Sequence, residues 1–218
     1  MCIGELEMQK YTGGGVSLHL FLYLFLQGGI TMSPRELMEY LELNPIIAAV
    51  HEHDFPTALS SPVGVIFCLK TNILHLADRV KEAHDAGKCI FVHIDLAEGV
   101  GKDRAGIEYL AALGVDGIIS TRTQLCRHAR EKGLIAVQRF FALDSQGLES
   151  ISENLENSAC DLVEIMPGVI GKTISRFAGG KVPVIAGGLI ETKKEVLAAL
   201  ECGALAVSTG KRELWYID

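Results

Sequence analysis

The sequence predicts one α/β domain built on a parallel sheet, because short apolar segments alternate with amphipathic ones from residue 32 onward. The apolar segments are rich in Val and Ile, which is typical of strands that are buried on both faces. Eight such segments occur, and no G-x-G-x-x-G motif follows the first, as a dinucleotide-binding fold would require. These observations favour a parallel β/α barrel of the TIM type over a doubly wound sheet.

The elements follow one another in a regular order. A helix with a favourable cap is expected to begin at Met32-Ser33-Pro34. The expected strands are Ile46–Val50, Val63–Leu69, Cys89–Ile94, Gly117–Ser120, Ile135–Phe140, Leu162–Ile165, Val182–Ala186 and Ala204–Ser208. The expected helices between them are Ile73–Ala86, Ala105–Leu113, Gln124–Lys132, Leu148–Glu156 and Lys193–Cys202. Four of these helices are followed by a glycine in the position of a C-cap, namely Gly87, Gly114, Gly133 and Gly203.

The domain is small for a barrel of this type. Only residues 51–62, which include Pro56 and Pro62, separate the first two strands. A parallel crossover generally needs a dozen or more residues including its helix, so the first helix must be short. The region 32–218 is also shorter than the roughly 200–250 residues that such barrels usually have. We therefore expect a barrel that is degenerate or incompletely closed.

Residues 1–31 do not share this pattern and are expected to be an atypical leader outside the single barrel domain 32–218. Their apolar run, Val16–Leu26, is too short to span a bilayer, and the segment lacks the basic start and cleavage site of a signal peptide. We hypothesise that translation begins at Met32, because Gln27–Ile30 can be encoded by a purine-rich stretch that resembles a ribosome-binding site. The chain is expected to be cytoplasmic and to have no membrane partner.

Composition limits the class of protein further. Of the 218 residues, 49% are apolar and 22% are charged, as in a globular domain. The net charge of −7 argues against an extended basic surface for nucleic acid, although a local basic patch remains compatible with it. Neighbouring cysteines are at least 21 residues apart, so no C-x-x-C pair is present for zinc or redox chemistry. We expect reduced cysteines that are mostly buried.

The most informative functional signal lies at the ends of the last two strands. Each strand ends in residues with little or no side chain, and a helix begins shortly afterwards. Such endings expose backbone N–H groups beside a helix N-terminus, which is how proteins commonly bind an anion. In β/α barrels the loops after strands seven and eight often bind a phosphate in this way. We predict that the phosphate of a small molecule binds at Gly187, Gly188, Leu189, Ser208 and Thr209.

Polar residues also follow the other strands, at the end of the barrel where binding sites lie. Burying a charged group on a strand costs free energy unless the group is paired with an opposite charge or takes part in ligand binding or catalysis. Two interpretations stay open: a ligand pocket, or an internal ion-pair network such as Arg139 with Glu164 or Asp95. A general acid–base pair, for example Asp95 and Glu164, is also compatible with the residue types. The candidate ligand-binding residues are His93, Asp95, Glu98, Arg122, Gln138, Arg139, Glu164 and Gly168.

Metal and covalent chemistry are less well supported. His51-Glu52-His53-Asp54 follows the first strand, where some metallohydrolase barrels begin their metal site, but the later strand ends lack the further ligands. Glu164, and not a lysine, lies on the sixth strand, so no Schiff-base nucleophile is predicted there. We predict no metal, no cofactor and no catalytic residue.

Six motifs, in order, resemble the glycerol uptake operon antiterminator family from about Ile46 to Trp215. They are Phe91–Leu96 with Glu98-Gly99, Asp116–Arg122, Val137–Phe141 with Asp144-Ser145, Glu164–Gly168, Ile185–Ile190, and Ala206–Thr209 with Leu214-Trp215. The resemblance implies a regulator on a degenerate barrel that responds to glycerol 3-phosphate. It also implies that transcription then proceeds through a terminator in the leader mRNA of glycerol-utilisation genes. The first loop departs from the family, which often has Arg or Lys and Asp where this chain has His51–Asp54.

Alternatives to the regulator remain. Fold and phosphate site would equally suit a phosphosugar isomerase or aldolase, since fold does not determine function. A third possibility is that the ligand site is vestigial and the protein acts only through protein partners. Direct RNA contact would use basic clusters that otherwise form solvated helix faces. Two clusters begin the helices that follow the phosphate loops, so ligand binding could be coupled to RNA binding. The candidate RNA-binding residues are Arg127, Arg130, Lys193, Lys194, Lys211 and Arg212.

Overall fold

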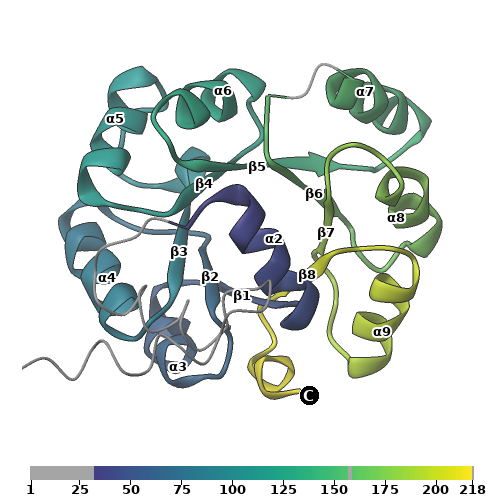
Figure 1. Ribbon diagram of the computed structural model, residues 1–218, viewed down its shortest axis with the longest axis horizontal. Helices are drawn as coiled ribbons and strands as arrows, with labels where there is room; N and C mark the ends of the chain where they lie inside the picture. Colours follow the sequence, from purple (N-terminus) through teal and green to yellow (C-terminus); the bar gives the residue numbers. More distant parts are fainter. Residues whose placement is uncertain (1–31, 157–158, 218) are drawn as a thin grey trace, which may run out of the picture.

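Eight parallel strands form a closed ring in the order β1 to β8, in the computed structural model, which describes residues 32–156 and 159–217 (Figure 1). The strands are β1 (Ile46–Val50), β2 (Val65–Cys68), β3 (Cys89–His93), β4 (Gly117–Ser120), β5 (Ile135–Phe141), β6 (Leu162–Met166), β7 (Val184–Gly187) and β8 (Ala206–Thr209). The ring closes where Ile47 of β1 pairs with Ser208 of β8. The expected TIM-type barrel is confirmed, whereas the expected incomplete closure was wrong.

Helices surround the ring on the outside (Figure 1). They are α3 (Phe55–Ser60), α4 (Ile73–Asp85), α5 (Arg104–Leu113), α6 (Thr123–Glu131), α7 (Ser145–Glu156), α8 (Gly171–Ala178) and α9 (Lys193–Glu201). Short 3₁₀ turns add η2 (Glu52–Asp54), η3 (Ile94–Leu96) and η4 (Arg212–Tyr216). The sequence predicted the short first helix, which is α3, but missed α8. The four glycines expected at helix C-caps all have positive φ, as that position requires.

The barrel closes in spite of its short first unit, because α3 covers the strands there with only two buried side chains. Phe55 and Ala58 of this helix are fully buried. They belong to the outer apolar shell, which lies between the strands and the surrounding helices. A six-residue helix is therefore enough to cover the outside of the sheet at this position.

Helix α2 (Pro34–Leu43) closes the N-terminal end of the barrel (Figure 1). It begins with a capping box between Ser33 and Glu36 and has a proline in its first turn, as expected. Its buried face, formed by Leu37, Tyr40 and Leu41, packs with the inward-facing strand residues in an inner apolar cluster. Because this end of the barrel is filled by apolar side chains, polar chemistry is left to the C-terminal end.

Two further expectations concern the chain as a whole. The predicted leader, residues 1–31, including its apolar run, lies outside the described residues. No helix in the described part is long and apolar enough to cross a membrane. None of the five cysteines in the described part forms a disulfide, and all of them except Cys202 are buried. Burial raises the pKa of the Cys68 thiol to about 11, so it remains protonated and unreactive at neutral pH.

Candidate functional site

A layer of polar side chains lies near the C-terminal ends of four strands. These side chains are His93 of β3, Arg139 of β5, Glu164 of β6 and Ser208 of β8, and all four are buried. Successive side chains of a strand point to opposite faces, and the residues two positions earlier on these strands belong to the inner apolar cluster. The layer therefore faces the inside of the barrel, at its C-terminal mouth.

Glu164 is the centre of this layer. One carboxylate oxygen, Oε2, accepts a hydrogen bond of 2.6 Å from Arg139 Nε, and the other, Oε1, accepts one of 2.5 Å from Ser208 Oγ. A side chain at Gly187 would collide with both Glu164 and Ser208, so only glycine fits at the end of β7. The internal ion pair of Arg139 with Glu164, one of the two sequence interpretations, is therefore present, and it joins β5, β6 and β8.

His93 differs from its neighbours because neither of its ring nitrogens has a hydrogen-bond partner among the described residues. The side chain is 4% exposed. Burial, helped by the nearby charge of Arg139, lowers the pKa of His93 to about 4 and outweighs the opposing effects of Asp95 and Glu164. His93 is therefore an uncharged hydrogen-bonding group at neutral pH.

Asp95 lies at the rim and holds the loop between β4 and α6. Its Oδ2 atom accepts hydrogen bonds from the Thr121 backbone N–H at 2.7 Å and from the Thr121 hydroxyl at 3.1 Å. Ser120 Oγ donates to the same carboxylate, and Arg122 Nε lies 3.6 Å from its Oδ1 atom. Asp95 and Arg122 are thus brought together, with the carboxylate already surrounded by donors.

Two of the predicted ligand-binding residues lie apart from this group. Gln138 points outward, where its amide Nε2 donates to Thr123 Oγ1 of α6 at 2.8 Å. Glu98 is exposed and pairs with Lys70 Nζ at 3.2 Å. Gly168 lies close to the phosphate loops instead, because its N–H donates to the Gly187 carbonyl at 2.6 Å.

The two predicted phosphate loops lie side by side. The backbone turns sharply after β7, where Gly188 and Leu189 have φ values of +75° and +62°. A left-handed leucine is uncommon, and such conformations often occur in ligand-binding loops. Thr209 Oγ1 donates to the Ile190 carbonyl at 2.8 Å, which ties the loop after β8 to the loop after β7. The five residues predicted to hold a phosphate therefore lie at the ends of β7 and β8 and in the turn after β7, and the bond from Thr209 to Ile190 joins the two segments.

The first loop has no metal-binding arrangement. His51 and His53 are exposed and their rings stack with centroids 6.3 Å apart, while Asp54 pairs with Arg212. Within residues 32–156 and 159–217, no group of three or more His, Cys, Asp or Glu side chains is placed to hold a metal ion.

The predicted RNA-binding cations do not form one surface. Arg130 pairs with Asp161 at 3.0 Å, next to the start of β6 and thus at the N-terminal end of the barrel. Lys211 pairs with Glu191 at 3.1 Å, at the opposite end. Arg127, Lys193 and Lys194 are exposed, on α6 and at the start of α9. The structure therefore separates these residues into groups on different sides, and several are neutralised by acids of the same chain.

The fold and the site together define a closed TIM-type β/α barrel with a buried polar layer beside the glycine- and hydroxyl-containing ends of β7 and β8. Residues 46–215 match the model of the glycerol-3-phosphate responsive antiterminator family, and the chain belongs to this family. The resemblance seen in the six sequence motifs is thereby confirmed.

Individual relatives agree with this assignment. The uncharacterized protein YgcP of Escherichia coli K12 is 33% identical over 183 residues, covering 82% of this chain and 95% of that protein. The crystal structure of a glycerol uptake operon antiterminator regulatory protein from Listeria monocytogenes has a TM-score of 0.74 and 34% identity, over 78% of this chain and 94% of that one. A related Thermotoga maritima protein has a TM-score of 0.69 and 36% identity, over 78% and 96% of the chains. Orotidine 5'-phosphate decarboxylase from Pyrococcus horikoshii, at 16% identity, shares the fold alone.

Proposed function

We propose that this protein is a glycerol-3-phosphate-responsive transcription antiterminator that binds its ligand at the C-terminal mouth of the barrel. The observation that carries the proposal is the position of the buried polar layer directly beside the two connected loops after β7 and β8. Backbone N–H groups around Gly188-Leu189 and Ser208-Thr209 would hold the phosphate. The glycerol end would then face the polar layer, where His93 is the group that still needs a hydrogen-bond partner.

The state of the carboxylates supports binding over catalysis. Both oxygens of Glu164 already accept short hydrogen bonds, and Asp95 accepts three from Ser120 at the end of β4 and from Thr121 just after it. A general base must be aimed at a bound substrate, whereas both carboxylates are here engaged by donors of the chain itself, which favours a role in positioning. We therefore favour a regulator over the phosphosugar isomerase or aldolase that the fold would also permit.

Titration calorimetry with glycerol 3-phosphate, followed by ³¹P NMR of the incubated mixture, tests the ligand and the absence of turnover together. We expect saturable binding of one ligand per barrel with no consumption. An alkyl phosphate without hydroxyls should bind about 1–3 kcal/mol more weakly, because the buried polar groups are left unpaired. Consumption of the ligand would support the enzyme, and no binding at millimolar ligand would contradict the proposed site.

Action on leader mRNA in the cytoplasm is the second part of the proposal. In vitro transcription of a template with the leader and terminator of a glycerol-utilisation gene should read through only when protein and glycerol 3-phosphate are both present. Read-through that is unchanged by the protein would contradict an antiterminator role, whatever the ligand affinity.

A further inference from the structure

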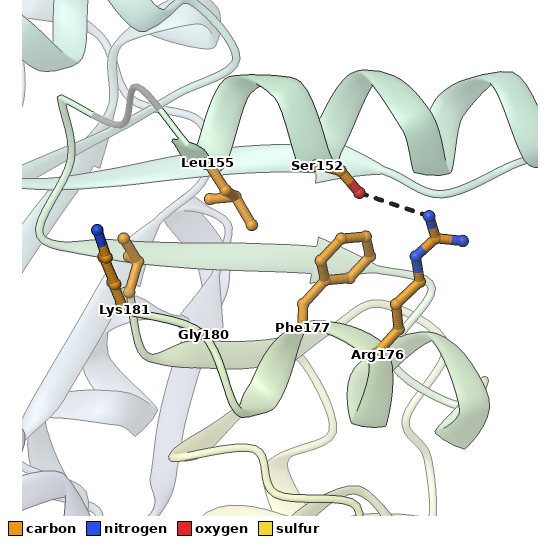
Figure 2. A pocket seen from close by; sticks show the side chains of 7 residues that line it. Ser152, Leu155, Arg176, Phe177, Gly180 and Lys181 are labelled. Atoms are coloured by element: carbon orange, nitrogen blue, oxygen red, sulfur yellow. Dashed lines mark hydrogen bonds between the residues drawn. The ribbon is translucent and has the colours of Figure 1, made fainter.

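A cavity of about 400 Å³ opens between α7 and α8, on the flank of the barrel (Figure 2). Leu155 of α7 and Phe177 of α8 point toward each other across it, whereas Arg176 and Lys181 lie at opposite ends (Figure 2). The lining residues are Ser152, Leu155, Arg176, Phe177, Gly180, Lys181 and Val182. We call this the α7–α8 groove. It has an apolar centre with one cation at each end.

The two cations of the groove are not neutralised by described residues. Arg176 contacts Ser152 Oγ at 3.5 Å and lies over the Phe177 ring, with its guanidinium carbon 5.6 Å from the ring centroid. Neither Arg176 nor Lys181 forms an ion pair with a residue in the described part of the chain, and none of the seven lining residues is acidic. Arg130, in contrast, already has a carboxylate partner. The groove therefore offers positive charge to an outside anion.

We infer that the α7–α8 groove binds single-stranded RNA, with one unstacked base against Leu155 and the guanidinium plane of Arg176 and neighbouring phosphates on Arg176 and Lys181. This inference rests on the proposed action on leader mRNA. Proteins read single-stranded RNA by placing bases against apolar or aromatic side chains and arginine planes, with cations along the backbone. A cavity of this size accommodates a nucleotide. An acidic protein segment would satisfy the two charges but would leave unused the guanidinium face of Arg176 that is turned away from Phe177.

The acidic balance of the chain fits a local site of this kind. A net charge of −7 weakens non-specific attraction to a polyanion, so RNA affinity must come from a few defined contacts. Two phosphate contacts predict a shallow salt dependence, with a slope of about −0.7 per contact for a single strand.

Helix α8 also connects this groove to the proposed ligand site. The turn before α8 packs on the loop after β7, where the Gly168 N–H donates to the carbonyls of Gly187 and Gly188 at 2.6 and 3.2 Å. The last turn of the same helix carries Arg176 and Phe177. A ligand that fixes Gly188 therefore also fixes the start of α8. Ligand and RNA should then strengthen each other's binding by the same factor, as thermodynamic linkage requires.

Fluorescence anisotropy of the full chain with a labelled single-stranded leader RNA, at saturating glycerol 3-phosphate, tests the inference. Arg176→Ala and Lys181→Ala should each weaken binding about tenfold and reduce the salt slope by about 0.7. Leu155→Trp should weaken binding without a change in charge, because it fills the space for the base. Arg130→Ala is the matched control and should stay within twofold of wild type. Unchanged ligand affinity by calorimetry shows that each variant is folded.

The outcomes separate this inference from the proposed function. If wild type binds the RNA and the groove variants bind equally well, the groove is not the site and the antiterminator proposal stands. If wild type binds glycerol 3-phosphate but no RNA, direct action on leader mRNA fails and the inference fails with it. Ultraviolet cross-linking of bound RNA should label the peptide that contains Phe177. Labelling confined to the segment around Lys211 and Arg212 would overturn the inference in favour of the basic cluster after β8.

Discussion

Mild acid should destabilise this protein through His93. The imidazole is 4% exposed, and burial with the nearby Arg139 charge lowers its pKa to about 4, against 6.5 for an unperturbed histidine. Between these two values the unfolded chain binds a proton that the folded protein does not bind. The contribution of His93 to stability is therefore complete above about pH 6.5 and falls as the pH decreases toward 4.

The magnitude follows from the pKa difference. The difference between a pKa of 6.5 and one of about 4, at about 1.36 kcal/mol per pH unit, corresponds to roughly 3 kcal/mol of stability in total. About 2 kcal/mol of this should be lost between pH 7 and pH 5, before most carboxylates titrate. His84 acts in the opposite direction, because its hydrogen bond to Asp116 raises its pKa and its contribution is lost as the pH rises through that value. A comparison with a His93 variant removes this background.

Urea unfolding of wild type and His93→Gln at pH 7, 6 and 5 is the appropriate assay. The stability of wild type relative to the variant should decrease by about 2 kcal/mol over this range. A difference that does not change with pH would refute the reasoning. Direct NMR titration of the wild-type imidazole gives a second measurement that does not depend on the variant, and a folded-state pKa near 6.5 would refute the reasoning equally.

Three further substitutions test the site and its supports. Gly188→Val should abolish calorimetric binding of glycerol 3-phosphate, because φ at this residue is +75°. Gly179→Ala is the control and should leave binding unchanged, since the added Cβ would meet no atom within 4 Å. Equal affinities of the two variants would disprove the placement of the phosphate. Thr192→Ala should lower the free energy of unfolding by about 1 kcal/mol through loss of the α9 capping box, and Thr192→Ser should retain it; equal urea midpoints would argue against the cap. Arg139→Met should cost about 3–5 kcal/mol by leaving Glu164 unpaired, and the added change Glu164→Leu should recover most of it; a double variant as unstable as the single one would contradict this account.

The sequence predicted the eight strands because buried parallel strands have a simple signature, a short run of Val and Ile between glycines and polar residues. It missed α8 because that helix has only eight residues and its first residue, Gly171, is a poor helix former. Glycine is needed there because a larger side chain would meet Cys202 of the neighbouring segment. That constraint exists only in the folded protein. The incomplete closure was wrongly expected because chain length was taken as a measure of ring closure, whereas α3 covers its strands with six residues.

The candidate site shows a similar limit. Residue types at the strand ends identify the mouth of the barrel, but they do not show which side chains point inward. Gln138 and Arg139 are neighbours on β5, yet one contacts α6 and the other lies inside the barrel. Strand register and barrel closure decide this alternation, and neither can be read from a local motif. The pairing of Arg130 with Asp161 likewise joins elements that are distant in sequence, so the sequence could not separate such paired cations from those of the α7–α8 groove, which have no ion pair among the described residues.

The Arg139–Glu164–Ser208 network is consistent with a barrel used for regulation. It links β5, β6 and β8 at the mouth, so a ligand bound beside it would contact three strands and the turn that leads into α8. An enzyme at this place needs a carboxylate that is free to exchange a proton, and Glu164 is instead held by two donors. A regulator needs ligand binding to alter a distant surface, and a network that joins several strands provides such a connection. The two functions therefore predict different results for Glu164→Gln. An enzyme would lose its activity, whereas a regulator would keep some ligand affinity and lose the ligand's effect on RNA.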